Sequence, residues 1–443
     1  MNKHKTVSGV IFFLVLVFVM TAHYIAIPKI HFPGDSETCV TGMIAAGVLN
    51  LDMHDIHFGM NAVSCDGILY DGPSIETHYN AREGNSSMWF AFNSPKFADH
   101  DVQLITTRKQ QLGIQGWFLY WLGRTYSIIH LSGKAYFYFA RGFYALLTAL
   151  VVTAVSFALN KACDNLMAAC FYCACFCSTW ITDFASNLYF VPFTWFLPML
   201  FGIMCMNRPD RKILWSVLVF LSVVLKCLCG YEHVTCVMMS TVVFSGTEYF
   251  FCLKSDKQRA SLMLKTSLWA GISAIAGFFA ALILHAYVRG DRNIADGLME
   301  IYRADVIRST FGSGGMFLRF AYIFRVTVSL FLRSSGGWAA LILLVLAVIS
   351  SYCAGVRHKI PVKKDVILLL LSFLSSMSWI ILAAGHGEAG LIINYVIWYM
   401  PFIPAALYVF IRQRLAVLIP DPEKQNVLLQ QSAGLLMRML WLS

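Results

Sequence analysis

The chain has 443 residues, of which 58% are hydrophobic and 13% are charged. Soluble domains carry about 25% charged residues, so the composition excludes an ordinary soluble globular protein and indicates a membrane protein. The formal net charge of +10 would suit a nucleic-acid partner. The Lys and Arg residues, however, cluster in short segments between apolar runs, which favours a membrane-topology signal over a nucleic-acid-binding face.

The apolar runs predict an all-α polytopic membrane protein with about ten transmembrane helices, since a span needs about 20 apolar residues. We expect these helices at 8–27, 137–158, 165–183, 189–206, 213–229, 234–253, 267–287, 336–355, 366–384 and 391–411. The first run lacks a small-x-small cleavage site before Pro28. We therefore interpret it as a retained span and not as a signal peptide.

Alternate connections between the runs collect positive charge, which predicts the orientation of the chain. With the amino terminus inside, five of the six inner segments hold two or more Lys or Arg, whereas the outer turns 184–188, 230–233 and 385–390 hold none. We expect cytoplasmic termini and one transmembrane domain, 1–411, followed by a cytoplasmic tail, 412–443, with an interfacial helix. Since the carboxyl terminus carries no eukaryotic retention signal, we expect a bacterial inner membrane.

The first long outer segment, 28–136, is predicted to be a large mixed extracytoplasmic loop. It holds ten of the 24 acidic residues and contains strand-like stretches. Its end, 112–129, has the pattern of an amphipathic interfacial helix, and its expected membrane anchors are Trp117, Tyr120, Trp121 and Tyr126. Cys39 and Cys65 also lie in this loop, where they either form a disulfide or stay free.

Two carboxylates follow the first span closely, in the stretch Pro33-Gly34-Asp35-Ser36-Glu37. A carboxylate near the membrane surface can accept a proton from a substrate hydroxyl, and partial burial raises its pKa and makes it a better base. Alternatively, Asp35 caps a helix after a Pro-Gly turn and Glu37 lies in the first turn of that helix.

A second long outer segment, 288–335, contains seven arginines and four acidic residues: Arg289, Arg292, Arg303, Arg308, Arg319, Arg325 and Arg333, with Asp291, Asp296, Glu300 and Asp305. Surplus arginine outside the membrane opposes the charge bias that sets the topology. Phosphate binding would explain the surplus, because guanidinium groups match phosphate oxygens. Ion pairing on a solvated helix is the alternative.

Two further groups of polar residues lie at the ends of apolar runs on the outer side. Lys226 lies inside an apolar run, about one turn before Tyr231, Glu232 and His233. We expect these three residues to bind substrate, and the alternative is that Glu232 and His233 are exposed turn residues. An ionisable residue at that depth usually faces the protein interior or a wet cavity, although a lysine that snorkels to the surface is the alternative. The second group, expected to bind substrate unless it is an ordinary aromatic belt, is His386, Glu388, Asn394 and Trp398, with Tyr395 at helical spacing.

Four cysteines, Cys170, Cys173, Cys175 and Cys177, fall in one apolar run. Their spacing does not put all four on one helical face, so we interpret them as small buried hydrophobes and not as metal ligands. The sequence contains no GxxxxGK[ST], HExxH or GxSxG motif, which leaves soluble-type NTPase, zincin and hydrolase chemistries without support.

The arrangement of a first span, an acidic motif just behind it in a long outer loop, and many later helices resembles the GT-C superfamily of polytopic glycosyltransferases. The resemblance covers the chain to about residue 411 and implies transfer of a sugar, with inversion, from a polyprenyl-phosphate donor to a glycan or lipid-linked acceptor. It implies Asp35 or Glu37 as general base, with Lys226, Arg289, Arg292, Arg303 and Arg308 at the donor phosphate. No metal is then required, but a divalent ion is compatible with the superfamily.

Two other functions stay open at this point. A transporter or flippase for a lipid-linked or anionic substrate predicts internal repeats and helices broken at the midplane, and the sequence gives no clear sign of either. An O-antigen polymerase or ligase would use arginines and a histidine in a late outer loop, and 288–335 has no histidine.

Overall fold

The computed structural model describes residues 3–27, 40, 43–44, 46–47, 60–65, 102–108, 111–127, 133–303, 316–333, 335–383 and 393–419. The described helices are α1 Lys3–Ala26, α5 Ile114–Ser127, α6 Gly133–Ala162, α7 Asn165–Cys177, α8 Thr179–Ala185, α9 Phe193–Asn207, α10 Lys212–Cys229, α11 Val234–Ser240, α12 Val243–Cys252, α13 Lys257–Arg289, α14 Ile294–Ile301, α16 Met316–Leu332, α17 Ser335–Arg357, α18 Lys363–Leu382 and α20 Phe402–Leu418. Two 3-10 helices, η2 Pro209–Arg211 and η4 Ile393–Tyr399, and one antiparallel pair of strands, β1 Met60–Cys65 and β2 Val102–Arg108, complete the described elements.

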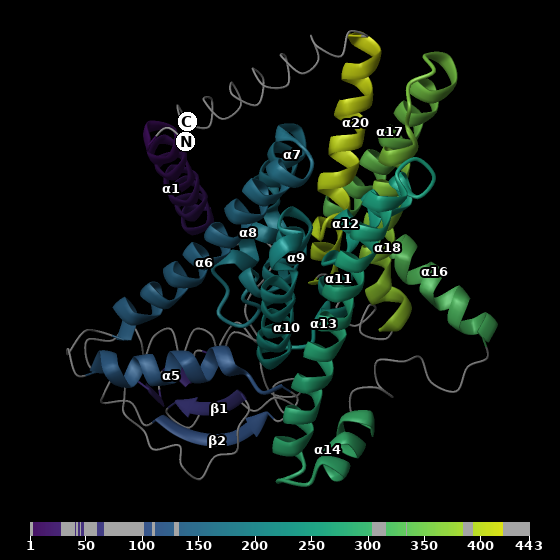
Figure 1. Cartoon of the computed structure of the whole chain (residues 1–443). Helices are drawn as coiled ribbons and strands as arrows, with labels where there is room; N and C mark the ends of the chain where they lie inside the picture. The colour runs from purple at the N-terminus through teal and green to yellow at the C-terminus, as the bar shows by residue number, and fades with distance from the viewer. Residues whose placement is uncertain are drawn as a thin grey trace.

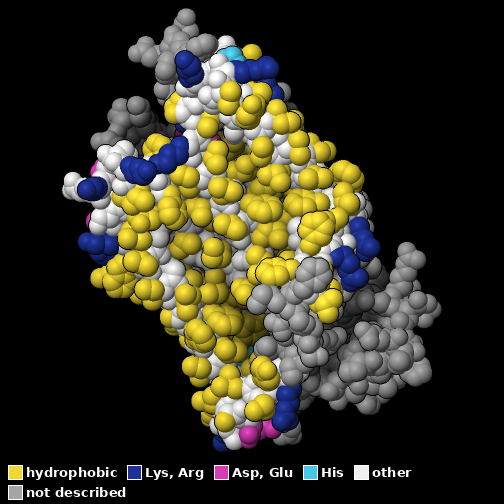
Figure 2. Space-filling model, turned by 90° about the vertical axis from the view of Figure 1, so that its right-hand side faces the viewer, with side chains coloured by type: hydrophobic (Ala, Val, Ile, Leu, Met, Phe, Trp, Pro, Cys, Tyr) yellow, Lys and Arg dark blue, Asp and Glu magenta, His cyan; other side chains and the backbone are white. Residues whose placement is uncertain are grey.

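The long apolar helices make the chain an all-α polytopic membrane protein, as the hydropathy pattern predicts. Six described helices are long and apolar enough to cross a bilayer, or up to nine if each bent pair is one span. Every predicted span coincides with a helix or a bent pair, but α9 has only 15 residues, so the predicted count of about ten is not confirmed. Figure 2 shows the apolar side chains as a broad continuous surface, which is what a bilayer would cover.

Three of the apolar segments are bent pairs of helices. α7 and α8 meet at 70°, α11 and α12 at 44°, and η4 and α20 at 41°. At the first break, Ser178 leaves the helical conformation and its hydroxyl accepts a hydrogen bond from the Ile181 amide at 3.1 Å. At the second break, a Cβ atom on Gly202 of α9 would lie 2.2 Å from the Thr241 carbonyl oxygen, so glycine is what lets α9 approach the bend.

Small residues let α10 and α13 pack closely along their length. Ala270, Ala274, Gly277 and Ala281 of α13 are all buried, and they follow one another at helical spacing. A Cβ atom at Gly277 would lie 2.6 Å from the Phe220 carbonyl oxygen of α10. In a bilayer, where lipid tails are as apolar as leucine, such close backbone contact is a main source of helix association.

The two ends of the bundle differ. α5, β1, β2 and α14 gather at one end, which we call the strand end. The connections α9–α10, α12–α13 and α17–α18 lie at the other end, with the start of α1 and the end of α20 (Figure 1). We call this second end the basic end, because it carries Arg208, Arg211, Lys254, Arg357 and Lys359 among its exposed residues.

Helix α5 confirms the helix expected at 112–129, but two of its expected membrane anchors are wrong. Trp117 and Tyr120 are 8% and 1% exposed, and they pack with Met43 and Ala46. Tyr120 is held tightly there, since a Cβ atom on Gly47 would lie 2.3 Å from its carbonyl oxygen. Trp121 is 54% exposed, as expected of an anchor. The side chain of Tyr126 lies outside the described residues.

The arginine-rich segment 288–335 is largely helical within the residues that the structure describes. It contains α14 and the 17-residue helix α16, which runs from Met316 to Leu332 and is largely apolar. The predicted boundary at 411 also falls inside a helix, because α20 continues to Leu418. Arg412 of that helix forms an ion pair with the buried Asp365 of α18, so the start of the predicted tail belongs to the bundle.

Candidate functional site

A buried lysine marks the strand end of α10. Lys226 is 1% exposed, and its Nζ atom donates a hydrogen bond of 2.5 Å to the Gly230 carbonyl oxygen, just past the helix end. The same Nζ atom lies 3.8 Å from Oε2 of Glu232. The helix therefore ends in a turn that returns a carbonyl and a carboxylate to the ammonium group, and the buried interpretation of Lys226 is confirmed over the snorkelling one.

The carboxylate of Glu232 is held from two directions. Gln111 Nε2 donates to its Oε1 atom at 2.5 Å, and the Tyr189 hydroxyl donates to the same atom at 3.1 Å. Burial opposes ionisation of this carboxyl, but the Lys226 ammonium, His233 and the hydrogen bonds outweigh it, so the pKa of Glu232 is lower than its ordinary value. Its side chain is still 25% exposed, which leaves a route for a ligand.

Helix α5 and the residue Gln111 before it are connected to the turn after α10 by neutral side-chain amides. Gln115 of α5 donates hydrogen bonds to the carbonyl oxygens of Tyr189, at 2.9 Å, and Cys229, at 3.0 Å. The Tyr144 hydroxyl of α6 donates to the Gln115 carbonyl oxygen at 3.2 Å. We call Gln111, Gln115, Tyr189, Lys226 and Glu232 the Lys226 cluster.

A buried layer of aromatic residues and one asparagine lies next to the Lys226 cluster. His233 has a left-handed backbone with φ of 60°, and its Nε2 atom lies 3.0 Å from Asn394 Oδ1, which also accepts from Trp379 Nε1 at 2.9 Å. Because an amide oxygen only accepts, His233 carries its proton on Nε2 in this arrangement. His233, Asn394, Trp379 and the neighbouring Trp195 are all less than 9% exposed.

The predicted substrate-binding residues after 390 do not share one cavity. Asn394 bonds to His233, Tyr395 packs on Trp180 at 5.0 Å, and Trp398 stacks on Phe331 at 4.6 Å. All three are core residues of the short helix η4. The ring of Tyr231 stacks on His285 of α13, with 5.5 Å between the ring centroids.

The arginines predicted to bind phosphate divide into two kinds. Arg289 is 8% exposed and donates to Glu300 Oε2 at 3.3 Å, so the ion-pair interpretation holds for this residue. Arg292 and Arg303 are exposed at the strand end, and Arg292 has a left-handed φ of 78°. Arg308 lies outside the described residues, as do Asp35, Glu37, His386 and Glu388.

No group of three or more His, Cys, Asp and Glu side chains is arranged to hold a metal ion within the described part of the chain. The interpretation of the four α7 cysteines as buried hydrophobes is confirmed for Cys170 and Cys175. It is wrong for Cys177, which is exposed, and Cys173 is only half-buried. Cys39 and the side chain of Cys65 fall outside the described residues.

The Lys226 cluster combines a buried cation with a partly exposed, ionised carboxylate. The cation can neutralise an anionic group that reaches the strand end, and the carboxylate can accept hydrogen bonds from hydroxyl groups. The sequence singled out Lys226 and Glu232 but missed Gln111, Gln115, Tyr189 and His285. The two glutamines are four residues apart on a polar-to-apolar boundary, and only that spacing hinted at a common role.

Comparisons with protein-family models, curated proteins and solved structures found no match to this chain.

Proposed function

We propose that this chain is a membrane glycosyltransferase of the GT-C type. It would move a sugar from a polyprenyl-phosphate donor to a glycan or lipid-linked acceptor on the extracytoplasmic face, with inversion at the anomeric carbon. The observation that supports this proposal most is the 2.5 Å hydrogen bond between Gln111, from the segment before α5, and Glu232, the partner of the buried Lys226. That bond joins the large segment after the first span to the Lys226 cluster at the strand end of the bundle.

Lys226 would neutralise the departing lipid phosphate, which carries the largest charge that develops in the reaction. Its present partner is loosely placed at 3.8 Å, so a phosphate oxygen can replace the carboxylate without leaving the ammonium unpaired. The exposed Arg292 and Arg303 would support the same charge from the strand end. Arg289 is occupied by Glu300 and is a weaker candidate for that role.

Glu232 would bind a sugar hydroxyl, and Asp35 or Glu37 would remove the proton of the acceptor. A carboxylate with a lowered pKa is a poor proton acceptor, and the pKa of Glu232 is lowered. A general base at neutral pH instead needs a pKa raised toward 7. The mechanism proposed here therefore assigns the proton transfer to the acidic motif behind the first span.

A transporter or flippase for a lipid-linked or anionic substrate is the second candidate, and one observation favours it. Three apolar segments are broken, at Ser178, near Thr241 and near Met400, and broken spans are typical of transporters. Against it, the layer of Trp195, His233, Trp379 and Asn394 below the Lys226 cluster is buried and closely packed. A substrate that crossed the bilayer at this point would have to displace that layer.

Labelled-sugar incorporation into lipid-linked or surface glycan tests the proposal. Membranes that contain the wild-type chain are compared with membranes that contain Asp35→Asn, Glu37→Gln or Lys226→Met, at matched expression. A loss of at least about a hundredfold in one acidic variant is expected for a general base. Full activity in both acidic variants would remove the base assignment, and full activity in Lys226→Met would remove the phosphate assignment.

A further inference from the structure

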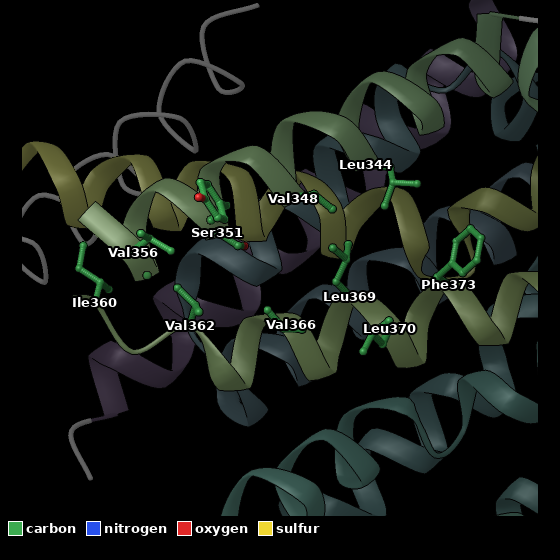
Figure 3. A pocket seen from close by; sticks show the side chains of 12 residues that line it. Leu344, Val348, Ser351, Val356, Ile360, Val362, Val366, Leu369, Leu370 and Phe373 are labelled. Carbon is green, nitrogen blue, oxygen red and sulfur yellow. The ribbon is translucent and has the colours of Figure 1, made fainter. Parts of the chain in front are cut away.

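Two apolar grooves flank helix α18 at the basic end of the bundle. The first, of about 750 Å³, lies between α17 and α18, and Val348, Val356 and Val366 line it (Figure 3). The second, of about 420 Å³, lies between α12 and α18. Leu370 of α18 lines both grooves, so the grooves run along the two sides of one ridge.

The grooves face outward from the bundle. Val348, Val356 and Leu370 are 51%, 61% and 56% exposed, and α17 and α18 are both long enough to span a bilayer. Exposed apolar side chains at this position meet lipid tails. Side chains from both helices, among them Val348 of α17 and Leu369 of α18, line the space between them (Figure 3), so this surface is a groove.

Positive charge lies where the grooves reach the basic end. Lys254 and Lys363 line the second groove. Arg357 and Lys359 are neighbours in sequence of Val356 and Ile360, which line the first groove, and all four cationic side chains are exposed. The nearby carboxylate of Glu248 pairs with Lys364 and Arg259.

We propose that this surface binds one anionic phospholipid of the leaflet at the basic end. One acyl chain would lie in each groove, on either side of Leu370, and the headgroup phosphate would lie among Lys254, Lys363, Arg357 and Lys359. Two grooves with a shared ridge match a lipid with two chains. Four cations match a headgroup with net negative charge, because a zwitterionic headgroup would bring its own ammonium into a positive field.

The site is separate from the Lys226 cluster, which lies at the opposite end of the bundle, so the inference stands whether or not the chain transfers sugars.

A lipid in the second groove would also act on a contact between two helices. Lys363 Nζ donates to the Phe251 carbonyl oxygen of α12 at 3.3 Å, so a phosphate that attracts Lys363 acts on the contact between α12 and α18.

Native mass spectrometry of the full chain in mild detergent tests this proposal. Phosphatidylglycerol and phosphatidylcholine with identical acyl chains are titrated separately, and the bound lipid is counted. The wild type should retain one phosphatidylglycerol at least about tenfold more tightly than phosphatidylcholine. Lys254→Glu with Lys363→Glu should remove this preference, since each basic residue near the headgroup contributes severalfold to anionic-lipid binding.

Matched variants distinguish binding at this site from an effect of net charge alone or of side-chain size alone. Arg208→Glu with Arg211→Glu makes the same charge change at the same end, on the α9–α10 connection, and should keep the preference. Val348→Trp fills the first groove and should weaken retention of the lipid at least about tenfold. Val345→Trp, on the same helix at a position that is 47% exposed and outside the lining, should not.

Two results would overturn the proposal. One is equal retention of the two lipids by the wild type, which would mean that the grooves hold any apolar chain. The other is an equal loss in the two charge-reversed variants, which would mean that the net charge of the basic end acts without a specific site. The thermal unfolding midpoint of each variant is measured beside the lipid count, so that a folding defect is recognised.

Discussion

Nζ of Lys226 lies 3.8 Å from Oε2 of Glu232, and the two side chains are unequally buried, at 2% and 25% exposed. A buried charge that loses its partner costs more than an exposed one, because water can solvate only the latter. The pair should therefore respond asymmetrically when one member is neutralised.

Glu232→Gln should destabilise the protein more than Lys226→Met. The first substitution leaves a buried ammonium with a backbone carbonyl as its remaining partner, at a cost on the order of 1–3 kcal/mol. The second leaves a carboxylate that still accepts from Gln111 and Tyr189. Thermal unfolding in detergent measures both, with the exposed Lys265→Met of α13 as control. A larger loss for Lys226→Met would contradict this account of the cluster.

The stabilisation by Glu232 should depend on pH in one direction. Because the pKa of Glu232 in the folded protein is below the ordinary value of 4.5, the ionised form is stabilised by folding. That contribution is complete above pH 4.5 and is lost as the pH falls through the folded pKa. The difference in unfolding midpoint between wild type and Glu232→Gln should stay constant from pH 7 to 5 and shrink below that. A difference that already disappears between pH 7 and 6 would argue against a lowered pKa.

Gly230→Ala should disturb the cluster without breaking the turn. Gly230 has an extended backbone with φ of 162°, which alanine adopts, but its Cβ atom would lie 2.3 Å from Glu232 Oε2 and 3.1 Å from Gln111 Oε1. The carboxylate must then move away from Lys226. We expect sugar transfer to fall at least about tenfold and the unfolding midpoint to fall as well, because Lys226 loses its carboxylate partner as it does in Glu232→Gln.

Gly142→Ala is the matched control for Gly230→Ala, since the nearest atom to its Cβ would be Ile25 Cδ1 at 3.9 Å. Wild-type activity in Gly142→Ala and reduced activity in Gly230→Ala is the expected pair of results. Wild-type activity in both would show that the position of Glu232 does not matter for catalysis.

Gly277→Ala should destabilise the contact between α10 and α13, because its Cβ atom would lie 2.6 Å from the Phe220 carbonyl oxygen. Overpacking against rigid backbone typically costs about 1–3 kcal/mol. Gly271→Ala, in the same helix, meets only Val242 Cγ1 at 3.5 Å and should be neutral or slightly stabilising, since alanine favours the helix. Equal unfolding midpoints of the two variants would argue against close α10–α13 packing.

Much of the fold could be predicted because a bilayer constrains the sequence strongly. Each apolar run became a helix or a bent pair, and the run at 213–229 differs from α10 by one residue at its start. The breaks could not be predicted, because the bend near Thr241 depends on the approach of Gly202 from another helix. The sequence does not predict a span at α16, because Arg319 and Arg325 interrupt its apolar pattern.

The site was predictable only where a residue opposed its surroundings. Lys226 was noticeable as a cation within an apolar run, and Glu232 was noticeable as its neighbour. Gln111 and Gln115 are neutral residues of a type common at surfaces, so their four-residue spacing alone does not predict the contacts with Glu232 and Cys229. Trp117 and Tyr120 looked like lipid anchors because an amphipathic pattern does not tell whether lipid or protein covers the apolar face.

The most direct test of the central claim uses purified protein in vesicles with a polyprenyl-phosphate sugar and a candidate acceptor. Our account predicts that the wild type forms a glycosidic bond and releases one polyprenyl phosphate per bond, and that Lys226→Met lowers this rate at least about a hundredfold. Movement of the lipid-linked sugar across the vesicle membrane with no new glycosidic bond and no released polyprenyl phosphate would contradict the account and favour a transporter.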